Sequence, residues 1–90
     1  MMQPGTWQEE GTQVIAEQIR VIWERELALD RISDDEDFFT LGGHSLIMQR
    51  IQGAIKDKLD VEVPMDELFT HSTIKDISAY IASMPPVLRS

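Results

Sequence analysis

The stretch Leu41-Gly42-Gly43-His44-Ser45-Leu46 organises this chain of 90 residues. Two adjacent glycines allow the backbone to turn with φ of either sign and to come close to a partner surface. Ser45 follows them and opens a long segment with the apolar periodicity of a helix, so we place it at a helix start. The first N–H groups of a helix lack backbone partners and the helix dipole is positive there. A phosphate attached to Ser45 is therefore expected to be stabilised.

Local spacing leaves two other interpretations of Ser45 to weigh. Serine is among the preferred N-cap residues, so the hydroxyl can serve only to cap the helix, although a capping box would place Glu or Gln where this chain has Met48. A hydrolase would use Ser45 as nucleophile and His44 as base. Sequence neighbours at a helix start point in different directions, and the second glycine of a nucleophile elbow is absent. We therefore expect no hydrolytic site.

Apolar periodicity predicts four helices. They are expected over residues 11–27, 45–59, 65–69 and 73–83. Pro64 suits the start of the short helix, because its missing N–H is not needed there. Thr73 followed by Asp76 is typical of an N-cap. The sequence thus predicts an all-α fold, a small four-helix bundle of three longer helices and one short helix, with a long loop between helices one and two.

Residues 27–41 show no sustained period and are rich in acidic side chains. A calcium loop of the EF-hand type starting at Asp30 would need a polar third residue and a glycine sixth, but Ile32 and Asp35 stand there. We interpret the segment as a solvated loop in which Phe38 or Phe39 inserts a ring into the core. Loops of this length are uncommon in small domains and are often functional, and this one leads to Ser45.

Composition excludes several classes of function. The chain has 16 Asp and Glu against 8 Lys and Arg, a formal charge of -8, which disfavours nucleic acid and anionic membranes as partners. There is no cysteine, and the two histidines, His44 and His71, lie far apart in sequence, so no metal site is expected. His71 is expected to be an ordinary polar loop residue. With no signal peptide or membrane-spanning run, we expect a soluble, cytoplasmic protein.

The pattern divides the chain into three parts. Residues 1–10 lack periodicity and are expected to be a flexible N-terminal arm, residues 11–83 one domain, and residues 84–90, which contain Pro85-Pro86, a C-terminal tail. The initial Met suggests a free-standing protein, although an excised fragment given a start codon would look the same.

Residues 35–46, Asp-Glu-Asp-Phe-Phe-Thr-Leu-Gly-Gly-His-Ser-Leu, closely resemble the phosphopantetheine attachment motif of peptidyl carrier proteins, the thiolation domains of nonribosomal peptide synthetases. The likeness covers about residues 12–82. It is carried further by Val61-Glu62-Val63-Pro64, Leu68-Phe69, Thr73-Ile74, Ile19, Ile22 and Trp23. The resemblance implies a non-catalytic carrier in secondary metabolism. Ser45, flanked by Gly42, Gly43 and His44, would receive 4'-phosphopantetheine from coenzyme A, and the terminal thiol would hold an aminoacyl or peptidyl group as a thioester.

The resemblance also implies partners. They are a phosphopantetheinyl transferase, an adenylation domain or enzyme, and condensation or thioesterase-type enzymes. The carrier is expected to be a monomer that binds each of them in turn. Such visits need small, weak contact surfaces, and we expect Leu46, Met65 and Phe69 to supply them together with His44. His44 stands where the fatty-acid and polyketide branch commonly has Asp, which favours the peptide branch. The strong negative charge keeps an acyl carrier protein as the alternative, and an unmodified helical interaction module is a third interpretation.

Overall fold

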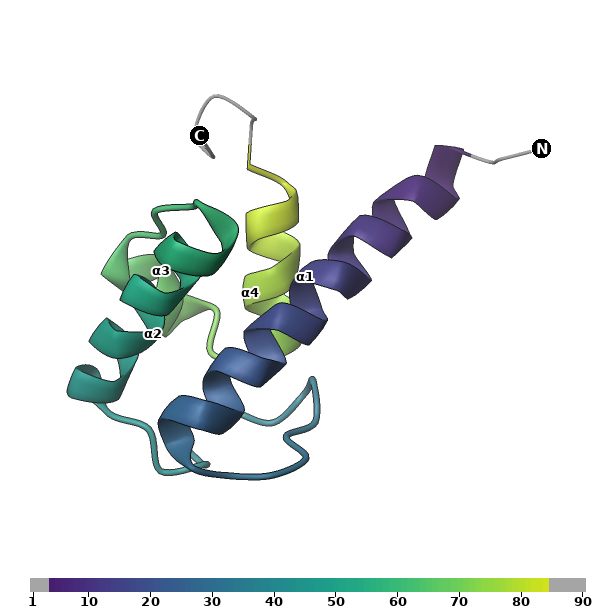
Figure 1. Cartoon of the computed structure of the whole chain (residues 1–90). Coiled ribbons are helices and arrows are strands. Elements are labelled where there is room, and N and C mark those ends of the chain that lie inside the picture. Colours follow the sequence, from purple (N-terminus) through teal and green to yellow (C-terminus); the bar gives the residue numbers. More distant parts are fainter. Residues whose placement is uncertain (1–3, 85–90) are drawn as a thin grey trace.

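Four helices and no strand make up the part of the chain that the computed structural model describes, which is the backbone of residues 4–84 and the side chains of residues 11–84. In chain order the helices are α1 (Pro4–Leu27), α2 (Ser45–Leu59), α3 (Met65–Thr70) and α4 (Ile74–Ala82). α1 packs against α2 and α4, and α3 packs against α2 (Figure 1). The predicted bundle of three longer helices and one short helix is confirmed.

The two ends of the predicted domain need correction. α1 begins at Pro4 and not near residue 11, so residues 4–10 are helical where a flexible arm was expected. Proline is favoured at the first helical position. The first turns of α1 extend past the other helices (Figure 1), and helical turns in such a place can form without an apolar stripe, so apolar periodicity does not predict them. At the other end Met84, assigned to the tail, is buried in the core. Residues 1–3 and 85–90 lie outside the described range.

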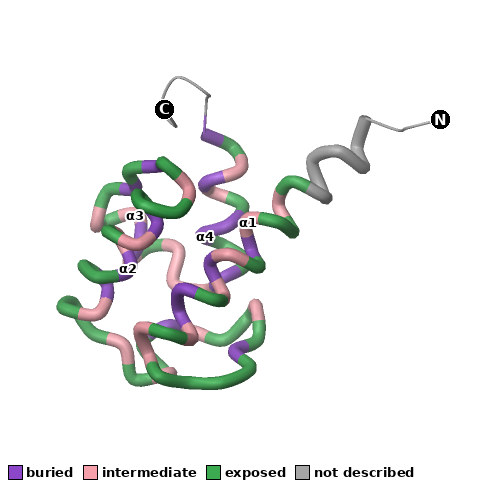
Figure 2. Tube along the Cα trace, in the orientation of Figure 1, coloured by how far each residue is buried: buried purple, intermediate pink, exposed green. Residues whose placement is uncertain are grey.

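The apolar stripes of α1, α2 and α4 meet in one core (Figure 2). The side chains that form its centre are at most 1% exposed: Ile19, Ile22 and Trp23 from α1, Met48, Ile51 and Ile55 from α2, and Ile74, Ile77 and Ile81 from α4. Burying a large apolar side chain contributes roughly 1.5–3 kcal/mol before its conformational entropy is subtracted. The predicted core position of Trp23 is confirmed. α2 is thereby held along its inner face, while its other face stays exposed.

The long loop of residues 28–44 is bound to the helices along its length. Arg20 Nε donates to the Ile32 carbonyl at 3.2 Å, and the Ile32 N–H donates to Glu24 Oε2 at 3.1 Å. Arg20 also pairs with the Asp34 carboxylate. Asp34 is thus connected to α1 although its side chain stays 41% exposed, and Asp30, Asp35 and Glu36 are exposed as the expected solvated loop requires.

Residues near the start of α4 hold the same loop from the other side. The Lys75 N–H donates to the Asp34 carbonyl at 3.0 Å, and the Phe38 N–H donates to the Ser72 carbonyl at 2.7 Å. Thr73 caps α4, since its hydroxyl oxygen accepts from the Asp76 N–H at 3.1 Å, which confirms the predicted N-cap. The loop is thus fixed against both α1 and the start of α4.

Candidate functional site

Ser45 is the first residue of α2, and His44 takes the N-cap position. His44 has extended backbone angles, φ -152° and ψ 179°, and its side chain makes no capping hydrogen bond. The interpretation of Ser45 as the N-cap is therefore wrong by one residue. Ser45 is exposed, and its hydroxyl has no hydrogen-bond partner among the described residues. The structure leaves this oxygen free to react.

The start of α2 is electrostatically suited to an anion. No acidic side chain lies in the first turn of α2, while Lys56 and Lys58 lie in its last turn. The unpaired N–H groups and the positive end of the helix dipole at Ser45 are therefore not offset by a nearby carboxylate of the same helix. A phosphodiester on the Ser45 oxygen fits this position.

The two glycines before His44 have different structural tasks. Gly42 has φ +94°, a conformation that residues with a side chain rarely adopt, and the space around it is open. Gly43 lies against the Phe38 ring, where an added Cβ would be 2.3 Å from Phe38 Cε2. The chain can turn into α2 only because Gly42 accepts this backbone angle and Gly43 accepts this close contact.

Phe38 and Phe39 contact each other edge-on, with 5.3 Å between ring centroids, but they differ in burial. The Phe38 ring is fully buried and packs edge-on against Trp23, with 5.4 Å between ring centroids. The Phe39 ring is 47% exposed and stacks on Phe69 of α3, with 5.7 Å between centroids and 14° between planes. Our sequence interpretation did not name Phe39 as a site residue. Two adjacent aromatic residues in a turn leading to Ser45 were the available signal.

The predicted contact residues differ in exposure. Leu46 is 56% exposed and His44 is exposed, so both are available to a partner. Met65 and Phe69 are half-buried and pack against the core on one side. Among the predicted apolar contact residues, Leu46 is thus the most exposed, and Met65 and Phe69 are only partly accessible.

Asp37 is a further residue that the sequence interpretation treated only as part of a solvated loop. Its Oδ1 accepts from the Ser72 hydroxyl at 2.6 Å, and its Oδ2 accepts from the N–H groups of Phe39 and Thr40 at 2.9 and 3.1 Å. These donors, the Ser72 hydroxyl above all, lower the pKa of Asp37 below its usual value of 3.8. The carboxylate is therefore a fixed part of the turn that precedes Ser45.

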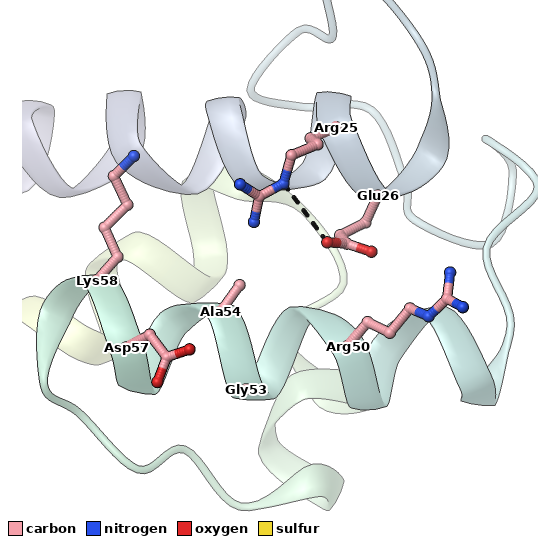
Figure 3. A pocket seen from close by; sticks show the side chains of 7 residues that line it. All are labelled: Arg25, Glu26, Arg50, Gly53, Ala54, Asp57 and Lys58. Atoms are coloured by element: carbon pink, nitrogen blue, oxygen red, sulfur yellow. Dashed lines mark ion pairs between the residues drawn. The ribbon is translucent and has the colours of Figure 1, made fainter.

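Two further polar features do not include Ser45. An open groove of about 700 Å³ between α1 and α2 is lined by Arg25, Glu26, Arg50, Gly53, Ala54, Asp57 and Lys58 (Figure 3). The Arg25 and Glu26 side chains on its rim pair at 3.5 Å. His71 ends α3, pairs with Glu67 at 3.2 Å and stacks on Tyr80, which agrees with an ordinary polar role.

The described residues offer neither a metal centre nor a membrane span. Within residues 11–84, no cluster of His, Asp and Glu is arranged to hold a metal ion. No helix in the described part of the chain has the length and apolar character needed to cross a membrane.

The fold and the site define a small helical domain in which an exposed serine hydroxyl, without a hydrogen-bond partner among the described residues, lies at the positive end of α2. The family model described as "Phosphopantetheine attachment site" matches residues 17–81, and the chain belongs to this family. Its prosthetic group is 4'-phosphopantetheine, and the free hydroxyl and positive helix end described above fit that group.

Similar proteins are nonribosomal peptide synthetases. The chain is 41% identical to bacitracin synthase 2 of Bacillus licheniformis over 69 residues, which cover 77% of this chain and 3% of that protein. It is 37% identical to gramicidin S synthase 2 of Brevibacillus brevis over 67 residues, which cover 74% of this chain and 2% of that protein. The chain therefore spans only a small part of the length of these relatives.

Solved structures agree with the sequence comparison. One chain from the complex of the phosphopantetheine transferase Sfp with coenzyme A and a peptidyl carrier protein superposes with a TM-score of 0.75 at 31% identity, covering 78% of this chain and 91% of that one. A chain from a non-covalent docking domain complex of the Pax NRPS gives a TM-score of 0.66 at 35% identity, with 81% and 75% covered.

Proposed function

We propose that this chain is a peptidyl carrier of nonribosomal peptide synthesis and that Ser45 carries its 4'-phosphopantetheine. The observation that supports this most is that Ser45 is exposed at the N-terminus of α2 and that its hydroxyl has no hydrogen-bond partner within residues 11–84. Family membership and the synthetase relatives support the same role. When bound, phosphopantetheine supplies a terminal thiol that holds an aminoacyl or peptidyl group as a thioester.

Loading requires a separate transferase. The Ser45 oxygen attacks the phosphorus of coenzyme A that bears pantetheine, a new O–P bond forms, and the bond to the leaving adenosine 3',5'-bisphosphate breaks. The serine proton passes to a base on the transferase, so Ser45 needs no lowered pKa of its own. The chain itself supplies an accessible oxygen, a turn that holds it in place, and a positive helix end for the resulting phosphodiester.

Catalysis is assigned to the partners and not to this chain. They are the phosphopantetheinyl transferase, an adenylating enzyme, and condensation or thioesterase-type enzymes in the cytoplasm, each visited by a monomeric carrier. The exposed Leu46 and the half-buried Met65 and Phe69 are the proposed contacts, with His44 beside them. A surface this small suits weak, successive encounters. The synthetase relatives favour a peptidyl cargo over the acyl cargo of fatty-acid or polyketide synthesis.

Intact mass tests the attachment. The purified chain is incubated with coenzyme A and the transferase Sfp, and we expect a mass gain of one phosphopantetheinyl group. Ser45→Ala should abolish the gain. Ser33→Ala, which changes another exposed serine of the loop, should preserve it. No gain in the unsubstituted chain, or a gain that persists in Ser45→Ala, would contradict the proposal.

A further inference from the structure

We propose that Asp37 is a positioning residue for the loading of Ser45: its carboxylate, held by Ser72, fixes the turn of residues 37–43 and thereby the place where α2 begins. This inference rests on the proposed function, because it concerns how efficiently Ser45 accepts phosphopantetheine. Asp37 lies eight residues before Ser45 and acts through the backbone between them.

Asp37 joins parts of the chain that are distant in sequence. Its Oδ1 accepts from the Ser72 hydroxyl at 2.6 Å, a contact between residues 35 positions apart. Next to it, the Phe38 N–H donates to the Ser72 carbonyl at 2.7 Å, so two hydrogen bonds connect the loop to the same residue. Ser72 stands between α3 and α4, and α4 is anchored in the core through Ile74 and Ile77. The turn is therefore hydrogen-bonded to a residue that directly precedes a helix packed in the core.

The other carboxylate oxygen organises the turn itself. Asp37 Oδ2 accepts from the N–H groups of Phe39 and Thr40, at 2.9 and 3.1 Å, and lies 3.5 Å from the Thr40 hydroxyl. The Asp37 carbonyl accepts from the Leu41 N–H at 3.1 Å. One residue thus satisfies several donors of the turn, which a side chain with a single acceptor could not do.

Further backbone hydrogen bonds connect this turn to the start of α2. The Gly42 N–H donates to the Phe39 carbonyl at 3.2 Å, and the Gly43 N–H donates to the Phe38 carbonyl at 3.0 Å. Gly43 also lies directly against the buried Phe38 ring. Only His44 then separates this fixed turn from Ser45, and the His44 carbonyl accepts from the Met48 N–H at 2.9 Å as α2 begins. A shift of Asp37 would therefore move the Ser45 oxygen.

Position matters for the loading reaction. The Ser45 oxygen must form its bond to the phosphorus of coenzyme A in line with the bond that breaks toward adenosine 3',5'-bisphosphate, while its proton goes to the transferase. A misplacement of about 1 Å can cost on the order of a hundredfold in rate. The carboxylate form of Asp37 is the form that the surrounding donors stabilise, as its lowered pKa indicates.

Two adjacent residues provide a matched test. Ser72→Ala removes the hydroxyl that holds Asp37, whereas Thr73→Ala removes the cap of α4 and leaves the Asp37–Ser72 contact in place. Each variant loses one side-chain hydrogen bond of the same segment. The rate of loading by Sfp is measured as a function of carrier concentration, well below the unfolding temperature of each variant, with circular dichroism as a check of folding.

We expect Ser72→Ala and Asp37→Asn to lower kcat about tenfold, with KM changed less than about twofold, because the docking surface remains while the oxygen is misplaced. Thr73→Ala should stay within about twofold of the unsubstituted chain in kcat, and Ser72→Thr, which keeps a hydroxyl, should restore loading. A merely structural role of Asp37 would lower the unfolding temperature without this split between kcat and KM.

The outcomes separate the inference from the proposed function. If the unsubstituted chain is loaded normally and Ser72→Ala keeps its kcat, or if Thr73→Ala is slowed as much as Ser72→Ala, the positioning role is overturned and the carrier function stands. If the unsubstituted chain gains no phosphopantetheinyl group, the proposed function fails and the positioning role fails with it.

Discussion

A Cβ added to Gly43 would lie 2.3 Å from Cε2 of Phe38, a separation that real Cβ atoms essentially never show. Gly43→Ala must therefore displace the buried Phe38 ring, which packs edge-on against Trp23. Overpacking of this kind costs about 1–3 kcal/mol. We expect a loss of that size in the free energy of unfolding, measured by urea denaturation.

Gly42→Ala is the control that separates crowding from backbone strain. An alanine at Gly42 meets no atom within 4 Å, but it must adopt φ near +94°, which costs about 1–2 kcal/mol. The NMR signals of the Phe38 ring and the Trp23 indole should move in Gly43→Ala and stay in place in Gly42→Ala. Equal ring shifts in the two variants would contradict the assigned contact.

Gly53→Ala should act in the opposite direction. Gly53 lies in the middle of α2, and the place that its Cβ would take has no atom within 4 Å. Alanine is favoured over glycine inside a helix by about 0.5–1 kcal/mol. We expect a higher urea midpoint with an unchanged denaturant slope. A lower midpoint would show that the groove beside Gly53 is too narrow for a methyl group.

Leu46→Ala should weaken docking without weakening the fold. Leu46 is 56% exposed, so its truncation should change the free energy of unfolding by less than about 0.5 kcal/mol. Burying this side chain against the transferase would contribute on the order of 1 kcal/mol, so we expect KM for loading by Sfp to rise about fivefold. Val14→Ala on α1 is the matched control, since Val14 is also 56% exposed. A similar rise in KM for Val14→Ala would speak against a specific contact at Leu46.

Stability should fall on the acid side as Asp37 is protonated. The hydrogen bonds from Ser72, Thr40 and Phe39 lower the pKa of Asp37 in the folded chain. Its contribution to stability is therefore complete above the unfolded pKa, near pH 4, and is lost as the pH falls through the lower folded value. Urea midpoints measured from about pH 6 to about pH 2 should decline less steeply in Asp37→Asn. Parallel declines in the two chains would contradict the linkage.

The helices could be predicted where local signals agree with the packing. The range 45–59 for α2 matches the structure, because Met48, Ile51 and Ile55 repeat at helical spacing and all face the core. The start of α4 was predictable for another reason, since Thr73 and Asp76 make a local cap. The start of α1 was not, because its first turns do not need an apolar stripe to form.

The sequence motif predicted the position of the reactive serine, but it did not predict the contacts that surround it. The pattern around Ser45 indicated a reactive hydroxyl, but the cap at His44 and the exposure of Phe39 depend on how the turn is held. Asp37 could not be distinguished from its acidic neighbours, because its partner Ser72 lies 35 residues away. Similarly, two adjacent glycines in a sequence indicate only a freely turning backbone. The fold shows in addition that position 43 must lack a side chain, because the Phe38 ring occupies that space.

The contact between Asp37 and Ser72 has a consequence for protein synthesis. A ribosome that has released the motif up to Ser45 has not yet made the residue that holds its turn, nor the helix that follows it. A nascent chain therefore displays the serine before that oxygen has its final orientation. Modification would then favour chains in which α4 has already been made over shorter nascent chains.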